Sequence, residues 1–523
     1  MKCCFFCEPA GFPTLGVEYL VSVLRGNLHE VDVVFDRKNF TAWEAFHPIS
    51  NLDDDIVDEI LASESQILFA YCTTVNFQRL VHLFGKIKSK FPDIITCIGG
   101  PHPTYAHEAA VRKDSIDYAC RGEGELAILE FIEYVDGIRD RLPSGIYRMN
   151  AGSIEGAGFG NLVHKLDDLP YPDKSDFFEN VPNSRSLYSI ASGRGCYNSC
   201  TFCNSPTMRN FYRGENLKFM RRRSVEDIID ELCLAKEAYR PKFVAFVDDT
   251  FIYNKKFLVV FAEQYKKRIG IPFGCSTIPD FFDEEIIDKL VDAGLSNVEV
   301  GIQSVNPTTR LNTFGRKETN EQFARFVHML RKRGIYVNTD HIINPWDQRE
   351  NLKEQVKVYS DVRPNFINVF HLQYFPNTQV IENAVKDGHL APEAVDHVGE
   401  GSIESYFLGG SIPEIMKSLH DLIIFLSFVP FLPSGLTKWI VDSPFFKIFK
   451  HVPIQAVLPL RAISALFHSA DASGRSQLKY VVLSLVKLDR LKANILQTAD
   501  IKRIASHKPA TGIKKASPLG RTL

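Results

Sequence analysis

The stretch from Ser192 to Pro206 reads SGRGCYNSCTFCNSP, and it decides how the rest of the chain is interpreted. Its cysteines, Cys196, Cys200 and Cys203, have CxxxCxxC spacing on a short loop, so their thiolates can converge on one metal centre. Three soft thiolates suit an iron–sulfur cluster better than a closed zinc site, which needs a fourth ligand that no nearby Cys or His supplies. The spacing therefore predicts a cluster with one iron left open.

The alternative interpretation is a group of free cysteines in a protein core, where cysteine is common. The loop also contains Arg194, Asn198 and Ser199, which make it too polar for a core strand. Gly193 and Gly195 fit a backbone that comes close to a cluster and turns sharply. These residues favour a metal-binding loop.

The loop resembles the signature of the radical S-adenosylmethionine (SAM) superfamily, including the aromatic Phe202 directly before the third cysteine. The resemblance implies a 4Fe-4S cluster held by the three cysteines, with SAM chelating the open iron through its amine and carboxylate. It also implies that the reduced cluster cleaves SAM to a 5′-deoxyadenosyl radical. An electron donor such as flavodoxin or ferredoxin would then be a partner.

The composition is that of an ordinary globular protein. The chain has 523 residues, of which 45% are hydrophobic and 24% charged, and its length allows three units of roughly 150 residues each. The formal net charge of -2 predicts no general affinity for nucleic acid.

The cysteines and the start of the chain predict a reducing, cytoplasmic setting. The start, MKCCFFCEPAG, has an apolar run too short for a signal peptide. A reducing compartment would also protect an oxygen-sensitive cluster. The other cysteines before residue 140 lie in or beside apolar runs and are predicted to be core residues: Cys3, Cys4, Cys7, Cys72, Cys97 and Cys120.

Residues 1–140 alternate short apolar runs with helical patterns. The predicted strands are Lys2–Phe6, Val31–Phe35, Ile67–Tyr71, Ile94–Ile98 and Tyr118–Cys120. The predicted helices are Val17–Arg25, Asp53–Ala62, Phe77–Phe91, His107–Arg112 and Glu125–Val135. Repeated βα units predict a parallel, doubly wound, Rossmann-like sheet whose ligand lies beyond the carboxyl ends of the strands.

The loops at those ends run from Glu8 to Gly16, Thr73 to Asn76, Gly99 to Pro103 and Gly122 to Glu125. In this order, ahead of the cysteine loop, they resemble the cobalamin-binding domain of cobalamin-dependent radical SAM enzymes. Their glycine pairs are expected to let the backbone approach a large flat ligand. The resemblance implies that cobalamin is bound by Thr14, Leu15, Gly16, Thr73, Thr74, Val75, Asn76, Gly99, Gly100, Pro101, His102, Gly122, Glu123, Gly124 and Glu125.

Many cobalamin-binding domains supply a histidine that ligates cobalt from below, and this chain differs from them. Their Asp-x-His-x-x-Gly motif is missing here, and the one Asp-x-His, from Asp387 to His389, lies outside the domain with Pro392 at the glycine position. We therefore expect cobalamin without a histidine lower ligand, which favours the four-coordinate, low-valent cobalt that attacks a methyl donor. His102, flanked by prolines, could substitute, but we expect a loop residue that touches the corrin edge.

Residues 141–183 are predicted to be a connector. The segment LPSGIYRMNAGSIEGAGFGNL suggests a hairpin, and DDLPYPDKSDF suggests a polar linker marked by proline. We place the domain boundary near Asp167–Phe177.

Residues 184–383 resume the βα alternation. The predicted strands are Leu187–Ala191, Phe243–Val247, Phe273–Ile278, Val298–Ile302, Tyr336–Ile343 and Ile367–Phe375. The predicted helices are Val225–Tyr239, Lys255–Arg268, Glu284–Ala293, Glu321–Arg333 and Arg349–Val362. Six units predict a partial (β/α)6 barrel with its reactive centre at the carboxyl ends of the strands.

Polar residues follow the predicted barrel strands. Asp248 and Asp249 stand where the family binds the SAM amino group, and a carboxylate pairs well with an ammonium. Gln303 and Ser304 stand where the family contacts the ribose, although glutamine replaces the usual acidic residue. Arg316 is a candidate for the SAM carboxylate.

The sixth strand is followed by Phe375–Thr378, which resembles the adenine-side loop of the family. For all of these strand-end residues the alternative is a turn or helix-capping role.

Residues 384–506 are predicted to be mainly helical, and 507–523 to be a disordered tail. The longest apolar run is too short to span a bilayer and is interrupted by Pro430 and Pro433. The helices could cap the barrel, or could touch a membrane surface and suit a lipid-like substrate. The membrane-touching residues would be Lys438, Trp439, Phe445, Phe446, Lys447 and Lys450.

Together these features predict an enzyme that methylates an unactivated carbon of a small-molecule or lipid-like substrate, using SAM, the cluster and methylcobalamin. The same cofactors could serve ring closure, rearrangement or oxidation without methyl transfer. A methylthiotransferase would want further cluster cysteines and an RNA-binding domain. A non-catalytic cobalamin or redox sensor is the remaining alternative, although no output module is recognisable.

Overall fold

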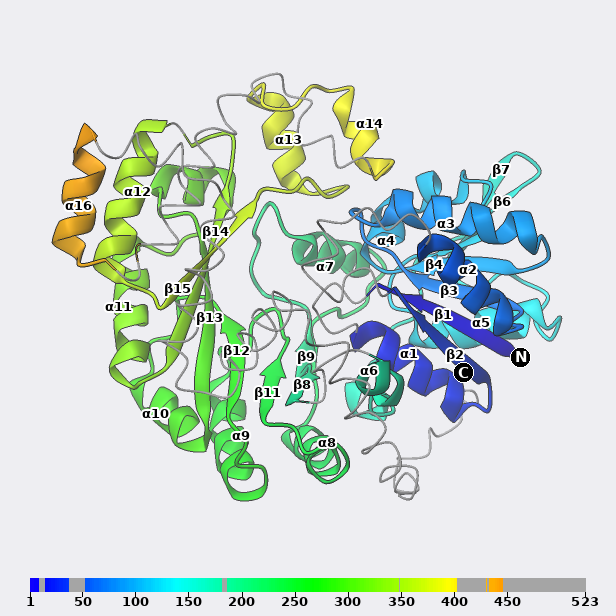
Figure 1. The fold of residues 1–523 in the computed structure, drawn as a ribbon, viewed down its shortest axis with the longest axis horizontal. Coiled ribbons are helices and arrows are strands. Elements are labelled where there is room, and N and C mark those ends of the chain that lie inside the picture. The colour runs from blue at the N-terminus through cyan, green and yellow to red at the C-terminus, as the bar shows by residue number, and fades with distance from the viewer. Residues whose placement is uncertain are drawn as a thin grey trace.

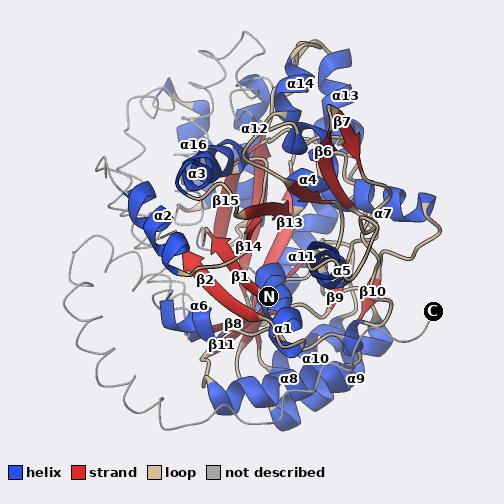
Figure 2. Cartoon of the chain, turned by 90° about the vertical axis from the view of Figure 1, so that its right-hand side faces the viewer, coloured by secondary structure: helices blue, strands red, loops and turns tan. Residues whose placement is uncertain are grey.

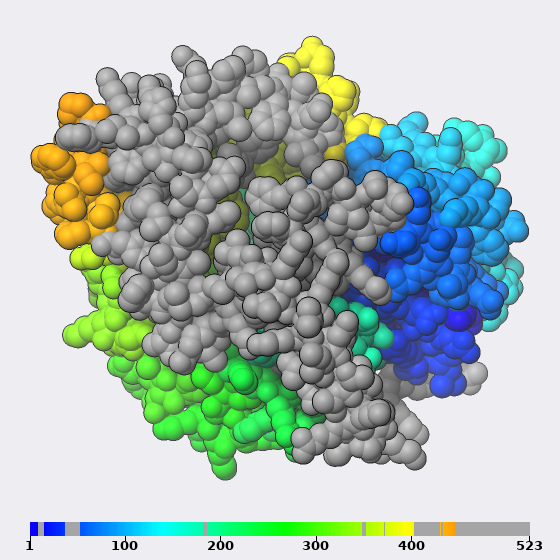
Figure 3. Space-filling view, in the orientation of Figure 1, coloured from blue at the N-terminus to red at the C-terminus, as the bar shows by residue number. Residues whose placement is uncertain are grey.

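The computed structural model describes residues 1–8, 15–36, 52–180, 186–347, 349–401, 429 and 432–444. Two α/β units occupy opposite sides of the molecule (Figures 1 and 3). Strands form the interior of both units, and helices surround them (Figures 1 and 2). This arrangement confirms the predicted α/β class.

The first unit is built on a seven-stranded sheet with the order β2-β1-β3-β4-β5-β6-β7. Its parallel strands are β1 (Lys2–Cys7), β2 (Glu30–Phe35), β3 (Ile67–Tyr71), β4 (Ile95–Gly99) and β5 (Tyr118–Cys120). Its helices are α1 (Leu15–Gly26), α2 (Leu52–Ala62), α3 (Phe77–Lys90), α4 (Pro101–Val111) and α5 (Glu125–Val135).

Helices cover both faces of this sheet, as predicted for a doubly wound fold. One core lies between the sheet and α2, α3 and α4, and the other between the sheet and α1 and α5. Burying both faces explains why the inner strands β1 and β3 are nearly continuous apolar runs in the sequence, whereas the edge strand β2 contains Glu30 and Asp32. The six cysteines before residue 140 are all buried, which confirms that they are core residues.

The connector begins as part of the first sheet. The predicted hairpin forms as β6 (Ile146–Asn150) and β7 (Ser153–Glu155), and β6 pairs antiparallel with β5. The sheet of the first unit therefore continues beyond residue 140. A short 3-10 turn (Leu166–Asp168) and α6 (Ser175–Asn180) lead to the second unit.

The second unit is an open barrel of six parallel strands with the order β15-β14-β13-β12-β11-β8. They are β8 (Leu187–Ile190), β11 (Phe243–Phe246), β12 (Phe273–Thr277), β13 (Leu295–Gln303), β14 (Tyr336–Ile343) and β15 (Phe366–His371). The helices on its outer face are α8 (Val225–Ala238), α9 (Lys255–Arg268), α10 (Glu284–Ala293), α11 (Asn320–Lys332) and α12 (Arg349–Val362). The partial barrel is confirmed.

Two elements near the cysteine loop were not predicted. A small ribbon pairs β9 (Gly193–Arg194) with β10 (Arg221–Arg222), and α7 (Asn204–Gly214) follows the third cysteine. In Figure 1, α7 lies between the two units. Its Tyr212 is buried against Phe159 and Leu162 of the connector.

The described part of the C-terminal region is helical, with α13 (Gln379–Lys386), α14 (Ala394–Gly399) and α16 (Ser434–Asp442). Helix α16 is tied to α12 by ion pairs from Lys357 to Asp442 and from Lys438 to Asp361. Phe445, Phe446, Lys447, Lys450 and the tail 507–523 lie outside the described residues. Among the helices that are described, none is both long and apolar enough to span a membrane.

Candidate active site

The cysteine loop lies between β9 and α7, at the carboxyl ends of the barrel strands. Arg209 of α7 holds its backbone, because Nη1 donates to the carbonyl oxygens of Cys196 at 2.6 Å and Asn198 at 3.0 Å. Its Nη2 donates to Oγ of Ser199 at 3.0 Å. Sequence reasoning missed Arg209, because only the helix that follows the loop brings it back over the cysteines.

Each cysteine sulfur accepts a hydrogen bond, as a thiolate ligand would. The Asn198 amide N–H and Nδ2 donate to Sγ of Cys196 at 3.4 and 3.5 Å. The Ser205 amide N–H donates to Sγ of Cys203 at 3.4 Å, at the start of α7. Arg316 Nη1 donates to Sγ of Cys200 at 3.7 Å. Donors to sulfur are part of what tunes an iron–sulfur cluster.

The three thiols fit a cluster better than a single ion. Within the described ranges, no three Cys, His, Asp or Glu side chains are grouped tightly enough to hold one metal ion. Each cysteine of a 4Fe-4S cluster binds a different iron, so the sulfurs need not meet at one point. Burial raises the pKa of Cys203 to about 12, so this thiol needs a metal to stay deprotonated near pH 7.

Asp248 and Asp249 have different environments. Asp248 is buried, and it accepts hydrogen bonds from the Ser192 amide at 2.9 Å and the Ser192 hydroxyl at 2.6 Å. Both of its carboxylate oxygens are therefore used to fix the start of the cysteine loop. Asp249 is exposed and accepts a hydrogen bond from Ser205 Oγ at 2.6 Å, beside the third cysteine. Of the two, Asp249 is the one that a SAM amino group could reach.

The candidates after β13 are arranged less favourably for a ligand. Gln303 has a positive φ of 66°, at a register shift between β13 and β14, and is partly exposed. Ser304 is fully buried, and its Oγ accepts the Asn306 amide at 3.1 Å. A ribose contact is thus open to Gln303, whereas Ser304 closes a turn.

Phe202 packs edge-on against Phe314, with ring centroids 5.1 Å apart, and helps to hold the cysteine loop. The guanidinium of Arg316 already contacts Cys200 and Glu318. These contacts use N–H groups that would otherwise bind the SAM carboxylate. The loop Phe375–Thr378 closes a turn on itself, and Asn377 Nδ2 donates to the Tyr105 carbonyl of α4 at 2.8 Å.

The loop after β3 is a compact polar turn with an apolar rim. Asn76 accepts hydrogen bonds from the Thr73 amide at 2.7 Å and the Thr73 hydroxyl at 3.1 Å, and its Nδ2 donates to Glu8 at 3.0 Å. Tyr71 and Val75 stay 38% and 49% exposed beside it. Exposed apolar side chains at the carboxyl ends of the strands fit a large flat ligand such as a corrin.

His102 lies in helix α4 and not in the loop where we expected it. Helix α4 begins at Pro101 rather than at His107, because proline is favoured in a first helical turn. His102 is fully buried, stacks on Phe77 with centroids 4.2 Å apart, and lies 3.3 Å from Thr74 Oγ1 through Nδ1. Burial lowers the pKa of His102 to about 4, so the ring is neutral near pH 7.

Gly100 and Gly122 are required by packing within the protein. A Cβ on Gly100, which has φ of +110°, would lie 2.9 Å from the Cys72 carbonyl, and one on Gly122 would lie 2.3 Å from the Tyr212 hydroxyl. Gly99 would tolerate a Cβ, and Gly16 lies exposed in α1 with Leu15 before it. Thr14 is outside the described residues. Close approach of a ligand is therefore not what requires Gly100 or Gly122.

Glu123 and Glu125 are both paired with arginine side chains. Arg194 pairs with both carboxylates, with Nη1 2.9 Å from Glu123, and Arg221 also pairs with Glu123. The Tyr212 hydroxyl accepts the Glu123 amide N–H at 3.0 Å. These two side chains therefore fasten the first unit to the ribbon that carries the cysteine loop, and a contact between this loop and cobalamin stays a prediction.

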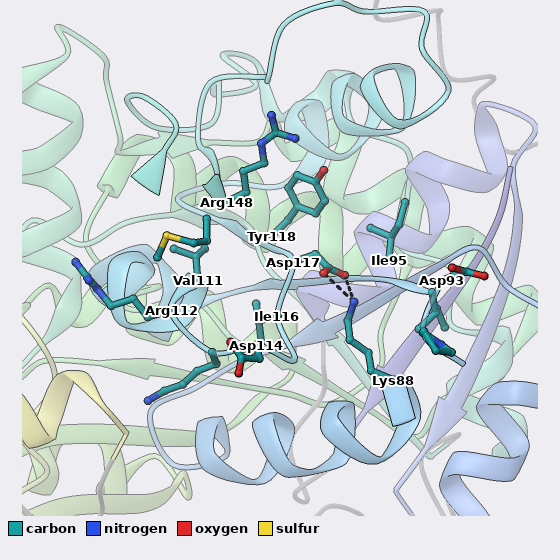
Figure 4. Close-up of a pocket in the computed structure, with 14 residues that line it drawn as sticks. Lys88, Asp93, Ile95, Val111, Arg112, Asp114, Ile116, Asp117, Tyr118 and Arg148 are labelled. Atoms are coloured by element: carbon teal, nitrogen blue, oxygen red, sulfur yellow. Dashed lines mark hydrogen bonds and ion pairs between the residues drawn. The ribbon is translucent and has the colours of Figure 1, made fainter. Parts of the chain in front are cut away.

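A pocket in the first unit lies away from the loops at the carboxyl ends of its strands. It has a volume of about 430 Å³ at the amino ends of β4 and β5, and Lys88 pairs with Asp117 inside it (Figure 4). Ligands of parallel α/β sheets bind at the opposite ends of the strands. This pocket is not the candidate active site.

Comparison with known families agrees with this arrangement. Residues 9–132 match the B12 binding domain, and residues 190–354 match the radical SAM superfamily. The chain belongs to the cobalamin-dependent radical SAM enzymes. This membership confirms SAM, an iron–sulfur cluster and cobalamin as the cofactors of the family.

Two relatives of this radical SAM enzyme are named after different reactions. An uncharacterized methyltransferase of Pyrococcus horikoshii is 26% identical over 391 residues, which are 72% of this chain and 80% of the relative. The anaerobic magnesium-protoporphyrin IX monomethyl ester cyclase of Rubrivivax gelatinosus is 25% identical over 330 residues, which are 60% of this chain and 58% of the cyclase.

The fold of the radical SAM enzyme also has a solved counterpart. The radical SAM methyltransferase TsrM from Kitasatospora setae, with cobalamin and a 4Fe-4S cluster bound, superposes with a TM-score of 0.64. The match covers 93% of this chain and 99% of TsrM at 16% identity, so it concerns the fold.

Proposed function

We propose that the protein is a methyltransferase that places a methyl group on an unactivated carbon of a small-molecule or lipid-like substrate. The observation that carries this proposal is the direct contact between the two units at the cysteine loop, through Arg194, Glu123 and Glu125. A cobalamin-binding sheet fastened to a cluster loop suits a reaction that needs both cofactors over one substrate. The methyltransferase name of the Pyrococcus horikoshii relative supports the same outcome.

The chain's own residues bind and orient the cofactors. Cys196, Cys200 and Cys203 are the proposed cluster ligands, and Asp249 is the proposed acceptor for the SAM amino group. When bound, the cluster supplies the electron that cleaves SAM, and cobalamin carries the methyl group. Catalysis by the protein then consists of placing these groups and excluding water.

We propose that cobalamin lies over Tyr71, Thr73, Val75 and the Gly99–Pro101 turn, with no histidine beneath the cobalt. The buried ring of His102, stacked on Phe77, supports this assignment because it is committed to the core. A reduced flavodoxin or ferredoxin is the proposed electron donor.

A second candidate function is ring closure or another radical outcome without methyl transfer. The Rubrivivax gelatinosus relative is named a cyclase, and this observation favours it. A methyltransferase forms one S-adenosylhomocysteine for each methyl group transferred, in addition to 5′-deoxyadenosine. A cyclase or oxidase forms 5′-deoxyadenosine alone.

The test is anaerobic reconstitution of the full chain with iron, sulfide and cobalamin, followed by reduction in the presence of SAM with an isotopically labelled methyl group. We expect a 4Fe-4S spectrum, 5′-deoxyadenosine, S-adenosylhomocysteine and label on the cobalamin. Protein that takes up both cofactors but never labels the cobalamin is not a methyltransferase.

The cluster ligands are tested by Cys200→Ala, with Cys233→Ala as the matched control, since Cys233 is a partly exposed cysteine on α8. We expect Cys200→Ala to lose the 4Fe-4S absorbance and most of its iron, because two cysteines cannot hold the cluster. Cys233→Ala should keep both. A normal cluster in Cys200→Ala would disprove the ligand assignment.

A further inference from the structure

A buried guanidinium lies directly against one of the proposed cluster ligands. Arg316 is only 6% exposed, and its Nη1 donates to Sγ of Cys200 at 3.7 Å. Its Nη2 donates to the Gly301 carbonyl at 2.6 Å, which fixes the guanidinium against the end of β13. The positive charge therefore has one position next to the sulfur.

Glu318 is the counterion of this guanidinium. It is 9% exposed, and its Oε1 and Oε2 lie 2.7 and 3.4 Å from Nη2 and Nε of Arg316. The two side chains therefore form an ion pair that is largely shielded from water. Arg316 contacts Cys200, and Glu318 lies on the other side of the guanidinium.

The sulfur and the guanidinium meet where little water can reach, since Cys200 is 8% exposed. Opposite charges at this distance interact strongly when little water screens them.

We propose that Arg316 and Glu318 set the reduction potential of the cluster that Cys200 helps to hold. Reduction adds one electron to the cluster and makes its charge one unit more negative, with no proton or leaving group involved. A fixed cation and an N–H donor at a ligand sulfur stabilise the reduced form, and a nearby carboxylate destabilises it. Arg316 therefore acts on the cluster through its fixed positive charge, without touching the substrate. This role rests on the proposed function, which places the cluster at Cys200.

The test is a redox titration of the reconstituted full chain in the absence of SAM, with dithionite as the reductant and the electron paramagnetic resonance signal of the reduced cluster as the readout. We expect Arg316→Gln to shift the midpoint potential to more negative values, because the cation is lost. Glu318→Gln should shift it to more positive values, because the cation is no longer balanced. Arg316→Lys should restore part of the first shift.

Opposite shifts distinguish charge tuning from loss of structure, since damage to the loop would affect both variants alike. Iron content and far-ultraviolet circular dichroism check the fold of each variant. The inference is overturned if the potential is unchanged in Glu318→Gln, or if both variants shift in the same direction. It is also overturned if Arg316→Gln keeps its potential and loses only SAM affinity.

Failure of this inference can be separated from failure of the proposed function. If the unmodified chain takes up no iron, the cluster assignment fails and the inference fails with it. If the unmodified chain holds the cluster and both glutamine variants keep its potential, the inference alone is wrong.

Discussion

Two carboxyl groups on neighbouring barrel strands share one amide partner. Asn368 Nδ2 donates to Asp340 on β14 at 3.0 Å and to Glu299 on β13 at 3.3 Å. Burial, and next the charge of Glu299, raise the pKa of Asp340 from 3.8 to about 8. Asp340 therefore keeps its proton in the folded protein at a pH where the unfolded chain has lost it.

This shift predicts that the barrel becomes less stable as the pH rises from 6 to 8. The folded state binds more protons than the unfolded state between pH 3.8 and about 8, so the stabilising contribution is complete at low pH and is lost on approach to pH 8. We expect a loss of up to ~1.4 kcal/mol per pH unit in the free energy of unfolding. Urea titrations at pH 6, 7 and 8 measure it.

Asp340→Asn should flatten this pH dependence, because the amide does not titrate. Glu299→Gln is the matched variant: it removes the repulsion, lowers the pKa of Asp340 and moves the loss of stability to lower pH. A slope in Asp340→Asn equal to that of the unmodified chain would refute the assignment.

At this scale the sequence predicts which residues cluster at the site but not which partners they take. The CxxxCxxC spacing identifies the cysteines, since the signal is local. Asp248 and Arg316 were assigned to SAM from their places along the chain, yet each is bound to protein groups, Ser192 and Glu318. Ser192 lies 56 residues from Asp248, so no local pattern could reveal that contact. Glu318 is only two residues from Arg316, but the spacing of the two charges does not show that they pair rather than bind a ligand.

At the scale of elements, apolar periodicity and capping residues made most helices predictable. Helix α10 starts after the capping residue Asp283 and ends before Gly294, whose φ is +116°. The exceptions carry weaker signals. Helix α4 has two prolines in its first turn and a kink at Ala106, and α7 is mostly polar, so tertiary contacts decide whether they form.

The loop between β5 and α5 depends on a glycine at one position. Gly122 has φ of +98°, and a Cβ there would lie 2.3 Å from the Tyr212 hydroxyl and 3.4 Å from its Cζ. Gly122→Ala should cost about 1–3 kcal/mol, from backbone strain together with displacement of Tyr212. Chemical denaturation of the full chain measures this cost.

The double variant with Tyr212→Phe separates the two contributions, because it removes the hydroxyl and leaves only the strain at φ. We expect Gly122→Ala to cost less in the Tyr212→Phe background than in the unmodified chain. Equal costs in both backgrounds would show that Tyr212 does not limit this loop.

At the scale of the whole molecule, buried charges join the two units. Lys174 of the connector pairs with Glu18 of α1, with side chains 2% and 4% exposed, and the Tyr171 hydroxyl of the connector donates to Asp227 of α8 at 3.3 Å. Together with Arg194 and its two glutamates, they tie α1, the connector and the barrel into one body. The placement of the first unit against the cysteine loop therefore depends on paired charges.

Arg194 supplies the cation at the centre of this contact. Arg194→Gln leaves the nearly buried Glu125 without its cation, and removal of one partner from a buried pair is more costly than replacement of both. We expect Arg194→Gln alone to destabilise the contact between the units by roughly 1–3 kcal/mol relative to Arg194→Gln with Glu125→Gln. In a calorimetric scan, the single variant should unfold in two separate transitions and the unmodified chain in one. A single transition in all three proteins would mean that Arg194 does not hold the units together, and that the remaining interface, including Lys174 and Glu18, suffices.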